Sequence, residues 1–565
     1  MTVDDWLARF ESALKARDAD AVAALFAPDS YWRDLVAFTW NVKTVEGRDG
    51  VTDLVKSCDP GASGFRTTEP PAEADGVTEA WIEFETALGR GKGHLRLTGE
   101  GAWTLLTTLE ELKGFEEPQR ERRPVYVEEE IARDPFVVVI GGGQGGIALG
   151  ARLRQLGVPA VVLERHDRAG DSWRKRYKTL TLHDPVWYDH LPYLPFPDHW
   201  PVFSPKDKIA DWLEMYTRVM EIPYWTRSEV TSISYDDGWT VTVDRDGETV
   251  LLHPRHVVFA TGMAGKPNVP TFPGADEFEG EQHHSSQHPG PDAYAGRKVV
   301  VIGANNSAHD ISAALVEHGA DVTMVQRSST HVIKSETLMD LGLGDLYSER
   351  ALAAGVTTER ADTLFASLPH RVLPGLQLPV QQQVRERDAE FYERLAGAGF
   401  EVDWGDDGSG LVLKYLRRGS GYYIDVGASE LVVNGSIKLA RGHVARLTAN
   451  AVVLDDGREL EADLVVYATG YGSMTGFVAD LGGEEMAARV GKVWGLGSDT
   501  YLDPGPWEGE QRNMWKPTQQ PGLWFHGGNL AQSRYFSRYL ALQLKARFEG
   551  LPTPVHGLQE VHHRS

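Results

Sequence analysis

A turn with three glycines is the feature of this sequence that most clearly predicts chemistry. Gly141, Gly143 and Gly146 follow the apolar run 136–140 and precede a segment with helical periodicity. In a strand-turn-helix unit of this spacing, the first glycine permits the tight turn, the second lets a pyrophosphate approach the backbone, and the third lets helix and strand pack closely. Glu164 ends the next apolar run, where a carboxylate can accept hydrogen bonds from ribose hydroxyls. The turn is therefore a candidate dinucleotide site.

A second turn of the same kind follows another apolar run, but it keeps only one of the three glycines. Gly303 stands at the first position, and Ala308 stands at the third, where alanine is a permitted variant. Asn305 replaces the second glycine, and we expect it to be tolerated because Asn adopts positive φ more readily than most residues with a side chain. Asn306 and Ser307 add side-chain donors at the start of the helix. The repeated pattern predicts a second dinucleotide site.

The residues after the next strand predict which dinucleotide the second site prefers. The apolar run 322–325 is followed by no acidic residue at the position that would contact the ribose. Arg327 can instead form a charge-assisted, bidentate contact with a 2′-phosphate, and Ser328 can donate to the same group. NADPH is therefore favoured over NADH. The alternative is that Arg327 is a plain surface residue at a strand end.

Residues 170–197 contain the motifs that separate one class of flavoprotein from the others. They read Gly-Asp-Ser-Trp-Arg-Lys-Arg-Tyr from position 170, Leu-His-Asp-Pro from 182 and Leu-Pro-Phe-Pro from 194. The segment resembles the class B flavin monooxygenases and is most similar to the plant-type flavin monooxygenases. The resemblance implies that Ser172 and Trp173 lie along FAD and that His183 lies near the flavin ring, where related enzymes typically have Asn. A helix-capping or core histidine is an equally open interpretation of His183.

The segment between the two turns resembles the fingerprint of the same class. Phe278, Gly280 and His284 have its spacing, but His288 stands where the fingerprint has an aromatic residue. The resemblance implies that His284 belongs to an interdomain region that changes position during turnover. His183 and His284 are our candidate catalytic residues, because histidine can tune proton transfer near neutral pH. An ordinary loop histidine is the alternative for His284.

Two short motifs are interpreted as the crossings between an FAD unit and an NADPH unit. Thr261 and Gly262 follow one apolar run, and Thr469 and Gly470 follow another. Each glycine can absorb a rotation of the backbone. Because the two motifs flank the second turn, we expect the NADPH unit to be inserted into the FAD unit.

Two further residues complete the set of candidate FAD contacts. Gln144 lies inside the first turn, and Asn529 is a good N-cap for a long helix predicted at 530–548. The N-terminus of that helix can stabilise negative charge on the flavin. Packing alone explains the helix equally well.

These sites require an α/β fold with two Rossmann-like dinucleotide-binding units. Continuous apolar runs such as 136–140 and 299–302 indicate strands that are buried on both faces, as in a parallel sheet. We expect an FAD unit at 134–290 and 461–565, interrupted by an NADPH and substrate-pocket unit at 291–460.

Residues 1–125 have a different pattern and predict a separate α+β unit. Two helices, the second extending to Phe26, are followed by alternating strands. This order resembles the NTF2-like (SnoaL-like) cone fold, and the charged stretch 116–133 is the predicted linker. We expect an accessory role, as a homodimer interface or a lid over the substrate. The alternative is a cyclase-like or hydratase-like pocket that uses Asp34 with neighbouring aromatic residues.

Composition limits the partners. A net charge of -24 argues against nucleic acid and anionic membrane surfaces, which both require clustered Lys and Arg. No apolar run approaches the roughly 20 residues of a spanning helix, and the N-terminus lacks the features of a signal peptide. We therefore expect a cytoplasmic protein. Cys58 is the only cysteine, which excludes an internal disulfide and flavin–dithiol chemistry. No metal site is predicted.

The resemblance implies an NADPH- and O2-dependent monooxygenase that inserts one oxygen atom into a small organic substrate through a C4a-(hydro)peroxyflavin. N- or S-oxygenation suits a nucleophilic substrate, whereas Baeyer–Villiger oxidation or oxidative decarboxylation suits a carbonyl. Three alternatives remain open at this point. They are an NADPH oxidase or flavin reductase, an FAD-binding redox sensor, and a multifunctional protein whose N-terminal unit is a separate cyclase or hydratase.

Overall fold

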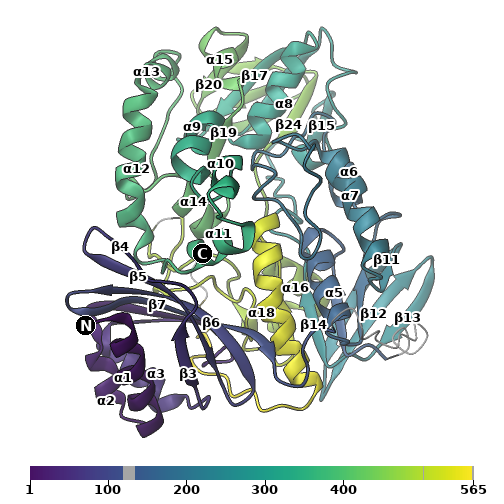
Figure 1. Cartoon of the computed structure of the whole chain (residues 1–565). Helices are drawn as coiled ribbons and strands as arrows, with labels where there is room; N and C mark the ends of the chain where they lie inside the picture. Colours follow the sequence, from purple (N-terminus) through teal and green to yellow (C-terminus); the bar gives the residue numbers. More distant parts are fainter. Residues whose placement is uncertain (119–133, 501, 563–565) are drawn as a thin grey trace.

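The computed structural model describes residues 1–118, 134–500 and 502–562. Most of the predicted linker lies outside these ranges. The described strands form six sheets, of which one belongs to the N-terminal unit and two are five-stranded parallel sheets (Figure 1). Within the same ranges, no helix is both long and apolar enough to cross a membrane.

The N-terminal unit packs three helices against a seven-stranded sheet. The strand order is β2-β1-β7-β6-β5-β3, with β4 paired to β5, and only β1 and β7 pair in parallel. Its core joins Trp6, Phe10, Phe26 and Trp32. The prediction that Phe26 belongs to the second helix is wrong, since Phe26 starts β1 and stacks on Trp32. The sequence did not reveal this because the same apolar residues fit a buried strand and the buried face of a helix equally well. The elements are α1 (Val3–Ala16), α2 (Ala19–Ala24), β1 (Phe26–Leu35), β2 (Val42–Glu46), α3 (Gly47–Ser57), β3 (Ser63–Thr67), β4 (Ala72–Ala74), β5 (Val77–Glu85), β6 (Gly89–Thr98) and β7 (Gly101–Leu112).

The first parallel sheet contains the strands on either side of the three-glycine turn. Its order is β10-β9-β8-β14-β25, and every neighbouring pair is parallel. β8 and β9 are fully buried, as continuous apolar strands of a parallel sheet should be. The long helix α18 packs on α5, the helix that follows the turn. The elements are β8 (Val137–Ile140), α5 (Gln144–Gln155), β9 (Ala160–Leu163), α6 (Asp171–Arg174), α7 (Lys206–Val219), β10 (Tyr224–Trp225), β14 (His256–Phe259), β25 (Leu523–Phe525) and α18 (Leu530–Phe548).

The second parallel sheet lies entirely between β14 and β25 in the sequence. Its order is β15-β24-β16-β17-β20, again with parallel neighbours only. The chain therefore leaves the first sheet after β14 and returns to it at β25. Two such sheets confirm the predicted α/β class. The elements are β15 (Glu281–His284), β16 (Lys298–Ile302), α8 (Asn306–Glu317), β17 (Asp321–Gln326), α15 (Ala428–Val433), β20 (Ile437–Arg441) and β24 (Leu464–Tyr467).

The remaining elements fill the space around these sheets. The segment from β18 to β19 is mainly helical and lies between the second parallel sheet and the N-terminal unit (Figure 1). Its elements are β18 (His331–Lys334), α9 (Ser335–Thr337), the π-helix η2 (Leu338–Leu343), α10 (Glu349–Ala353), α11 (Thr358–Ala366), α12 (Leu373–Arg387), α13 (Ala389–Gly397), α14 (Leu411–Arg418) and β19 (Tyr422–Asp425). The others are β11 (Ser228–Tyr235), β12 (Trp239–Arg245), β13 (Glu248–Leu252), η1 (Ser285–Gln287), β21 (Val444–Thr448), β22 (Ala451–Leu454), β23 (Glu459–Glu461), α16 (Thr475–Gly482) and α17 (Glu484–Val490).

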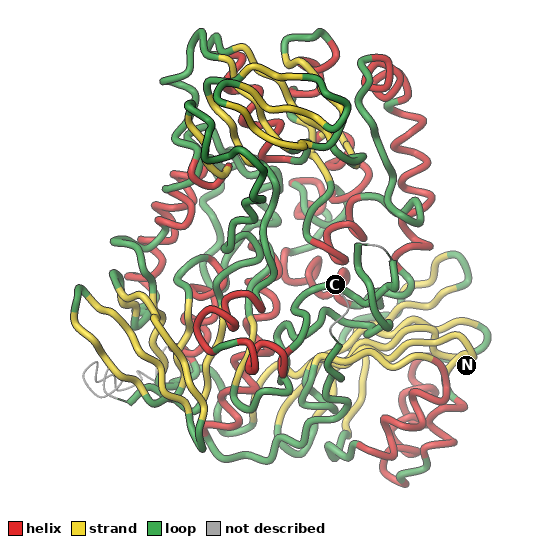
Figure 2. The backbone as a smooth tube through the Cα atoms, turned by 180° about the vertical axis from the view of Figure 1, so that it is seen from behind, coloured by secondary structure: helices red, strands yellow, loops and turns green. Residues whose placement is uncertain are grey.

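The N-terminal unit is joined to the rest of the molecule by its own sheet. Arg33 of β1 forms a buried bidentate ion pair with Glu510, at 2.8 and 2.7 Å. The C-terminal tail also returns to this unit, where the Asn41 amide donates to the His556 carbonyl at 2.9 Å. Figure 2 shows the C-terminal tail beside the N-terminal sheet. The N-terminal unit is therefore held against the rest of the molecule by direct contacts.

Candidate active site

The three glycines of the first turn are required for different reasons. Gly141 has φ of +107°, and a Cβ there would lie 2.6 Å from the Ala260 carbonyl oxygen. A Cβ on Gly146 would lie 2.0 Å from the Gly141 carbonyl oxygen. At Gly143 the nearest atom to an added Cβ is the Ser172 Oγ, at 3.6 Å. The protein's own packing thus requires Gly141 and Gly146, whereas a Cβ at Gly143 would make only an ordinary contact with Ser172.

Buried polar atoms without partners lie beside the first turn. The Ser172 Oγ, the Thr261 Oγ1 and both ring nitrogens of His526 make no hydrogen bond within the described residues. Each lies beside the turn: Thr261 faces Gly141, and the His526 ring lies 3.5 Å from a Cβ built on Gly145. Buried polar groups are normally hydrogen-bonded. A phosphate-bearing cofactor fits here, because it would supply the missing partners. His526 was missed by sequence reasoning, and its only signal was its place directly before Gly527 and Gly528.

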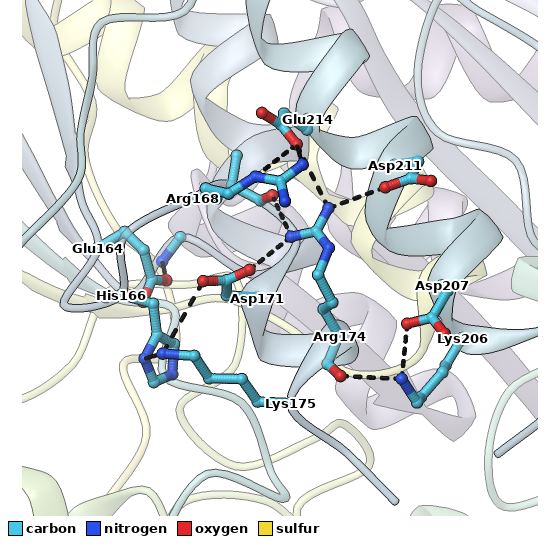
Figure 3. Close-up of polar contacts among 12 residues, drawn as sticks. Glu164, His166, Arg168, Asp171, Arg174, Lys175, Lys206, Asp207, Asp211 and Glu214 are labelled. Carbon is cyan, nitrogen blue, oxygen red and sulfur yellow. Dashed lines mark hydrogen bonds and ion pairs between the residues drawn. The ribbon is translucent and has the colours of Figure 1, made fainter. Parts of the chain in front are cut away.

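Glu164 lies at the end of β9, where the sequence predicted a ribose acceptor. It is buried, and its carboxylate accepts from the backbone amides of Gly142 at 3.1 Å and His166 at 2.8 Å. These two contacts fix the carboxylate against the turn. Figure 3 shows Glu164 at the start of the loop that leads to α6.

An ionic network holds α6 in place beside the turn (Figure 3). Arg174 contacts Asp171 on its own helix and Asp211 and Glu214 on α7, at 2.5, 3.0 and 3.3 Å. With α6 fixed, the Trp173 indole donates to the Gln144 side-chain oxygen at 3.1 Å. Ser172 and Trp173 are thus brought to the first turn, and the expectation that they lie along FAD stays a prediction.

The start of α18 meets the same turn from the other side. The Gln144 amide donates to the Gly528 carbonyl at 3.4 Å. Asn529 caps α18 by accepting from the Gln532 backbone at 2.9 Å within a full capping box, which confirms the predicted N-cap and the bounds of this helix. The Asn529 amide also donates to the Tyr188 hydroxyl at 3.0 Å.

The second turn repeats the geometry of the first with one difference from the prediction. Gly303 has φ of +131°, and a Cβ there would lie 2.3 Å from the Ala468 carbonyl oxygen, while Ala308 is fully buried at the third position. The expectation that Asn305 uses positive φ is wrong. Asn305 is extended, with φ of −103°, because it is the N-cap of α8 and N-caps adopt β-region angles. Gly143, the N-cap of α5, has the same kind of conformation.

The candidate phosphate contacts of the second turn lie at the surface. Arg327 and Ser328 are exposed at the end of β17. No hydrogen bond or ion pair is found for the Arg327 side chain among the described residues. Asn306 instead supports the fold, since its side-chain oxygen accepts from the Ile424 backbone at 3.0 Å. Ser307 lies half-buried beside it in the first turn of α8.

His183 connects the segment after the first turn with α8, the helix of the second turn. Its Nε2 lies 3.2 Å from the Asp310 carboxylate on α8, and the Tyr177 hydroxyl donates to the same carboxylate at 2.8 Å. Burial acts to lower the pKa of His183, but the hydrogen bond and the negative charge of Asp310, together with Asp184, outweigh burial and raise it. Asp310 and Tyr177 were not predicted, because nothing in the sequence pairs residues so far apart.

His284 is fixed to the second crossing. Its Nδ1 accepts from the Ser286 backbone at 3.1 Å, and its Nε2 lies 3.0 Å from the Gly470 carbonyl oxygen, so Nε2 is the protonated nitrogen. It is 1% exposed, and burial lowers its pKa. Both ring nitrogens of His284 are therefore occupied by the protein.

The two crossings lie side by side. The Asn268 backbone donates to the Gly470 carbonyl at 3.0 Å, and the Thr469 hydroxyl donates to the Asn268 carbonyl. Gly262 and Gly470 have nearly equal positive φ values, +80° and +81°. Arg176, which follows α6, donates to the Tyr471 hydroxyl at 3.0 Å. The crossings therefore form one short antiparallel contact between the two sheets.

Asp34 of the N-terminal unit is held by four hydrogen bonds. One carboxylate oxygen accepts from the Thr39 backbone, the Thr39 hydroxyl and the Phe38 backbone, and the other accepts from the Thr107 hydroxyl. Its side chain is fully buried, and burial raises its pKa to about 6. These hydrogen bonds hold the turn at 36–40 in place. Across the described ranges there is also no cluster of residues able to hold a metal ion.

Comparisons with known proteins point in the same direction as this geometry. A family model described as a pyridine nucleotide-disulphide oxidoreductase matches residues 138–357, a segment that contains no cysteine. Indole-3-pyruvate monooxygenase YUCCA1 of Oryza sativa subsp. japonica is 32% identical over 360 residues, covering 63% of this chain and 80% of that protein. Indole-3-pyruvate monooxygenase YUCCA4 of the same organism is 31% identical over 368 residues, covering 62% and 77%.

Two solved structures of cyclohexanone monooxygenase share the fold. The open crystal structure matches with a TM-score of 0.52 at 19% identity, covering 74% of this chain and 89% of that chain. The ε-caprolactone-bound structure in the Loose conformation matches with a TM-score of 0.53 at 20% identity, covering 73% and 88%. At such identities the likeness concerns the fold alone.

Proposed function

The chain belongs to the flavin-dependent monooxygenases, the family of the indole-3-pyruvate monooxygenases, and on that premise we propose that it uses FAD, NADPH and O2 to insert one oxygen atom into a small organic substrate. The observation that supports this best is the set of unpartnered polar atoms of Ser172, Thr261 and His526 beside the first turn, where the Gly143 backbone carries no side chain. A cofactor with a pyrophosphate would contact that backbone and supply those partners.

Each cofactor has its own set of residues in this proposal. FAD is held by the first turn, the α6 segment and the start of α18: Gly141, Gly143, Gln144, Gly146, Glu164, Ser172, Trp173, Thr261, Gly262, His526 and Asn529. NADPH is held by the second turn, the end of β17 and the second crossing: Gly303, Asn305, Asn306, Ser307, Arg327, Ser328, Thr469 and Gly470. When bound, NADPH supplies hydride to FAD, and reduced FAD activates O2.

The protein's own residues align the two modules. His183 binds Asp310 on α8 and so fixes the segment after the first turn against the helix of the second turn. His284 binds the Gly470 carbonyl and fixes the crossing between the sheets. We assign both histidines as positioning residues, with His183 also able to hold a proton near the cofactors because Asp310 favours its charged form.

The N-terminal unit is a scaffold of the NTF2-like kind in this proposal. Three helices packed on a strongly paired sheet support that fold, and the fully bonded Asp34 argues against a separate cyclase or hydratase. The predicted homodimer stays a prediction. Because the face with Arg33 is covered by the chain's own loop at Glu510, a second copy would have to bind elsewhere.

The runner-up is an NADPH oxidase, which would use both cofactor sites and release peroxide. The test is to supply FAD-loaded protein with NADPH, isotopically labelled O2 and, in turn, a sulfide, an amine, a ketone and a 2-oxo acid. A monooxygenase transfers one labelled oxygen atom to at least one substrate and identifies the reaction class. Peroxide equal to the NADPH consumed with every substrate would instead support the oxidase.

A further inference from the structure

A small cavity lies where the N-terminal unit meets the flavin module, the part of the chain built on the first parallel sheet. Its volume is about 40 Å³, and Arg33 of β1, Phe365 of α11 and Tyr535 of α18 all contribute to its wall. Figure 1 shows α11 and the start of α18 close together at the centre of the molecule. The cavity is close to the first turn, because its lining residue Tyr188 accepts from Asn529, and the neighbouring Gly528 accepts from Gln144.

Aromatic side chains dominate the lining. Trp515 stacks on Phe536 with ring centroids 3.9 Å apart, and Tyr188 meets Tyr347 edge-on at 4.7 Å. Phe365 and Tyr535 complete the aromatic wall. Flat rings pack well against stacked and edge-on aromatic groups, so this lining favours an aromatic ligand.

Every charge at the cavity is already matched. Arg33 is paired with Glu510, and Asp362 is paired with Arg534 through two hydrogen bonds of 2.8 and 2.7 Å. Burial lowers the pKa of His370 to about 4, which makes this lining residue neutral near pH 7. A charged ligand would lose its hydration and find no counter-charge, so the cavity disfavours carboxylates and amines.

Two hydrogen-bonding groups in the wall are unused. The Tyr535 hydroxyl is buried and makes no hydrogen bond within the described residues. The Trp515 Nε1 is buried and has no partner within the described residues. The indole N–H can only donate. Trp515 also has a left-handed backbone with φ of 62°, a strained conformation for a bulky residue that the surrounding packing enforces.

We propose that this cavity is the substrate-binding end of the proposed monooxygenase, that its ligand is an uncharged aromatic compound with one hydrogen-bond acceptor for Trp515, and that the N-terminal unit closes it with Arg33. The inference rests on the proposed function for its role in catalysis. A cavity of 40 Å³ holds only a few water molecules, so the ring enters when a side chain moves. Phe365, half-buried on α11, is the side chain that gives way.

The test is equilibrium binding to the FAD-loaded, oxidised protein by titration calorimetry, with three ligands of similar size. Acetophenone is neutral and has an acceptor, ethylbenzene is neutral and has none, and benzoate is charged. We expect acetophenone to bind with one site per chain, and benzoate to bind at least about tenfold more weakly. Benzoate binding as tightly as acetophenone would overturn the inference.

Trp515→Phe removes the donor, and Trp212→Phe is its matched control because the Trp212 Nε1 is also buried without a partner, away from the cavity. Trp515→Phe should weaken acetophenone about fivefold and leave ethylbenzene unchanged, while Trp212→Phe changes neither. If the Trp515→Phe protein does not retain flavin, the Phe365→Ala protein is tested instead. We expect it to bind acetophenone more tightly than the wild type. An unchanged affinity of Phe365→Ala for acetophenone would contradict the proposal.

The two proposals fail in different ways. If NADPH reduces the bound flavin but none of the three ligands binds, the cavity inference is wrong and the proposed function stands. If NADPH does not reduce the flavin, the proposed function itself is wrong.

Discussion

Gly143 and Gly146 lie in one turn, but the protein and its cofactor need them for different reasons. An alanine at Gly146 would place its Cβ 2.0 Å from the Gly141 carbonyl oxygen. The same change at Gly143 meets only the Ser172 Oγ at 3.6 Å and requires no unusual φ, since Gly143 has φ of −76°. On the proposed function, the demand for glycine at Gly143 would come from the pyrophosphate of FAD.

This difference predicts opposite behaviour in two alanine variants. Gly146→Ala should lower the melting temperature of the apoprotein, because the clash is internal. Gly143→Ala should melt like wild type and lose FAD affinity by about tenfold or more, since a Cβ blocks the approach of the phosphate. Melting curves with and without FAD, and the flavin content after dialysis, make the comparison. Wild-type flavin content in Gly143→Ala would contradict the assignment of the turn.

His183 and Asp310 predict a pH dependence of stability. The folded-state pKa of His183 is raised because its charged form binds Asp310, although burial opposes the shift. A raised pKa means that the stabilisation is complete below the unfolded value of about 6.5 and is lost as pH rises through the folded value. Relative to His183→Gln, the wild type should therefore lose stability as pH increases above neutrality.

Denaturation at several pH values measures this difference. His318→Gln is the control, because His318 also lies near an aspartate, Asp292 at 4.0 Å, but is exposed. A wild-type and His183→Gln difference that stays constant with pH would exclude the ion pair.

At the scale of elements, α18 brings the flavin module and the proposed substrate cavity together. Asn529→Ala removes the side-chain half of the capping box and the contact with Tyr188, so the free energy of unfolding should fall by about 1–2 kcal/mol. Asn529→Ser keeps a capping oxygen and should recover most of this loss. Asn434→Ala, at an exposed turn, is the comparison for a lost local hydrogen bond. Equal effects of all three variants in chemical denaturation would mean that the cap does not hold α18.

Elements set by local pattern were predictable, and those set by distant contacts were not. The bounds of α18 and the strands around both turns follow from periodicity, caps and glycines that lie within a few residues of one another. β1 was missed because its apolar residues fit a helix as well as a strand. The Arg33–Glu510 and His183–Asp310 contacts join residues from different units, and no spacing rule connects them. His526 was missed for a related reason, since its importance comes from lacking a partner.

At the scale of the whole molecule, the buried Arg33–Glu510 pair makes the N-terminal unit part of the structure. Arg33→Met leaves Glu510 buried without its counter-charge and should cost about 3–5 kcal/mol of unfolding free energy. Adding Glu510→Gln to Arg33→Met should recover part of that cost, because the unpaired charge is removed. Arg394→Met, which breaks the exposed Arg394–Glu430 pair, should cost less than about 1 kcal/mol. Additive effects of the two buried changes would show that the pair does not couple the units.

Because the N-terminal unit is packed against the rest of the molecule through Arg33 and Glu510, its removal should affect more than the unit itself. A chain without residues 1–118 would expose Glu510 and the wall of the central cavity that Arg33 forms. We expect such a chain to retain both nucleotide turns, which lie elsewhere, and to lose affinity for the substrate.

Two turns that bring FAD and NADPH together are the central claim, and anaerobic titration of the FAD-loaded protein with NADPH tests it most directly. We predict that one equivalent of NADPH bleaches the visible absorbance of the flavin. NADH should be much less effective, because it has no 2′-phosphate for Arg327 to bind. A protein that retains no FAD, or whose bound FAD keeps its colour with either nucleotide, would contradict the account.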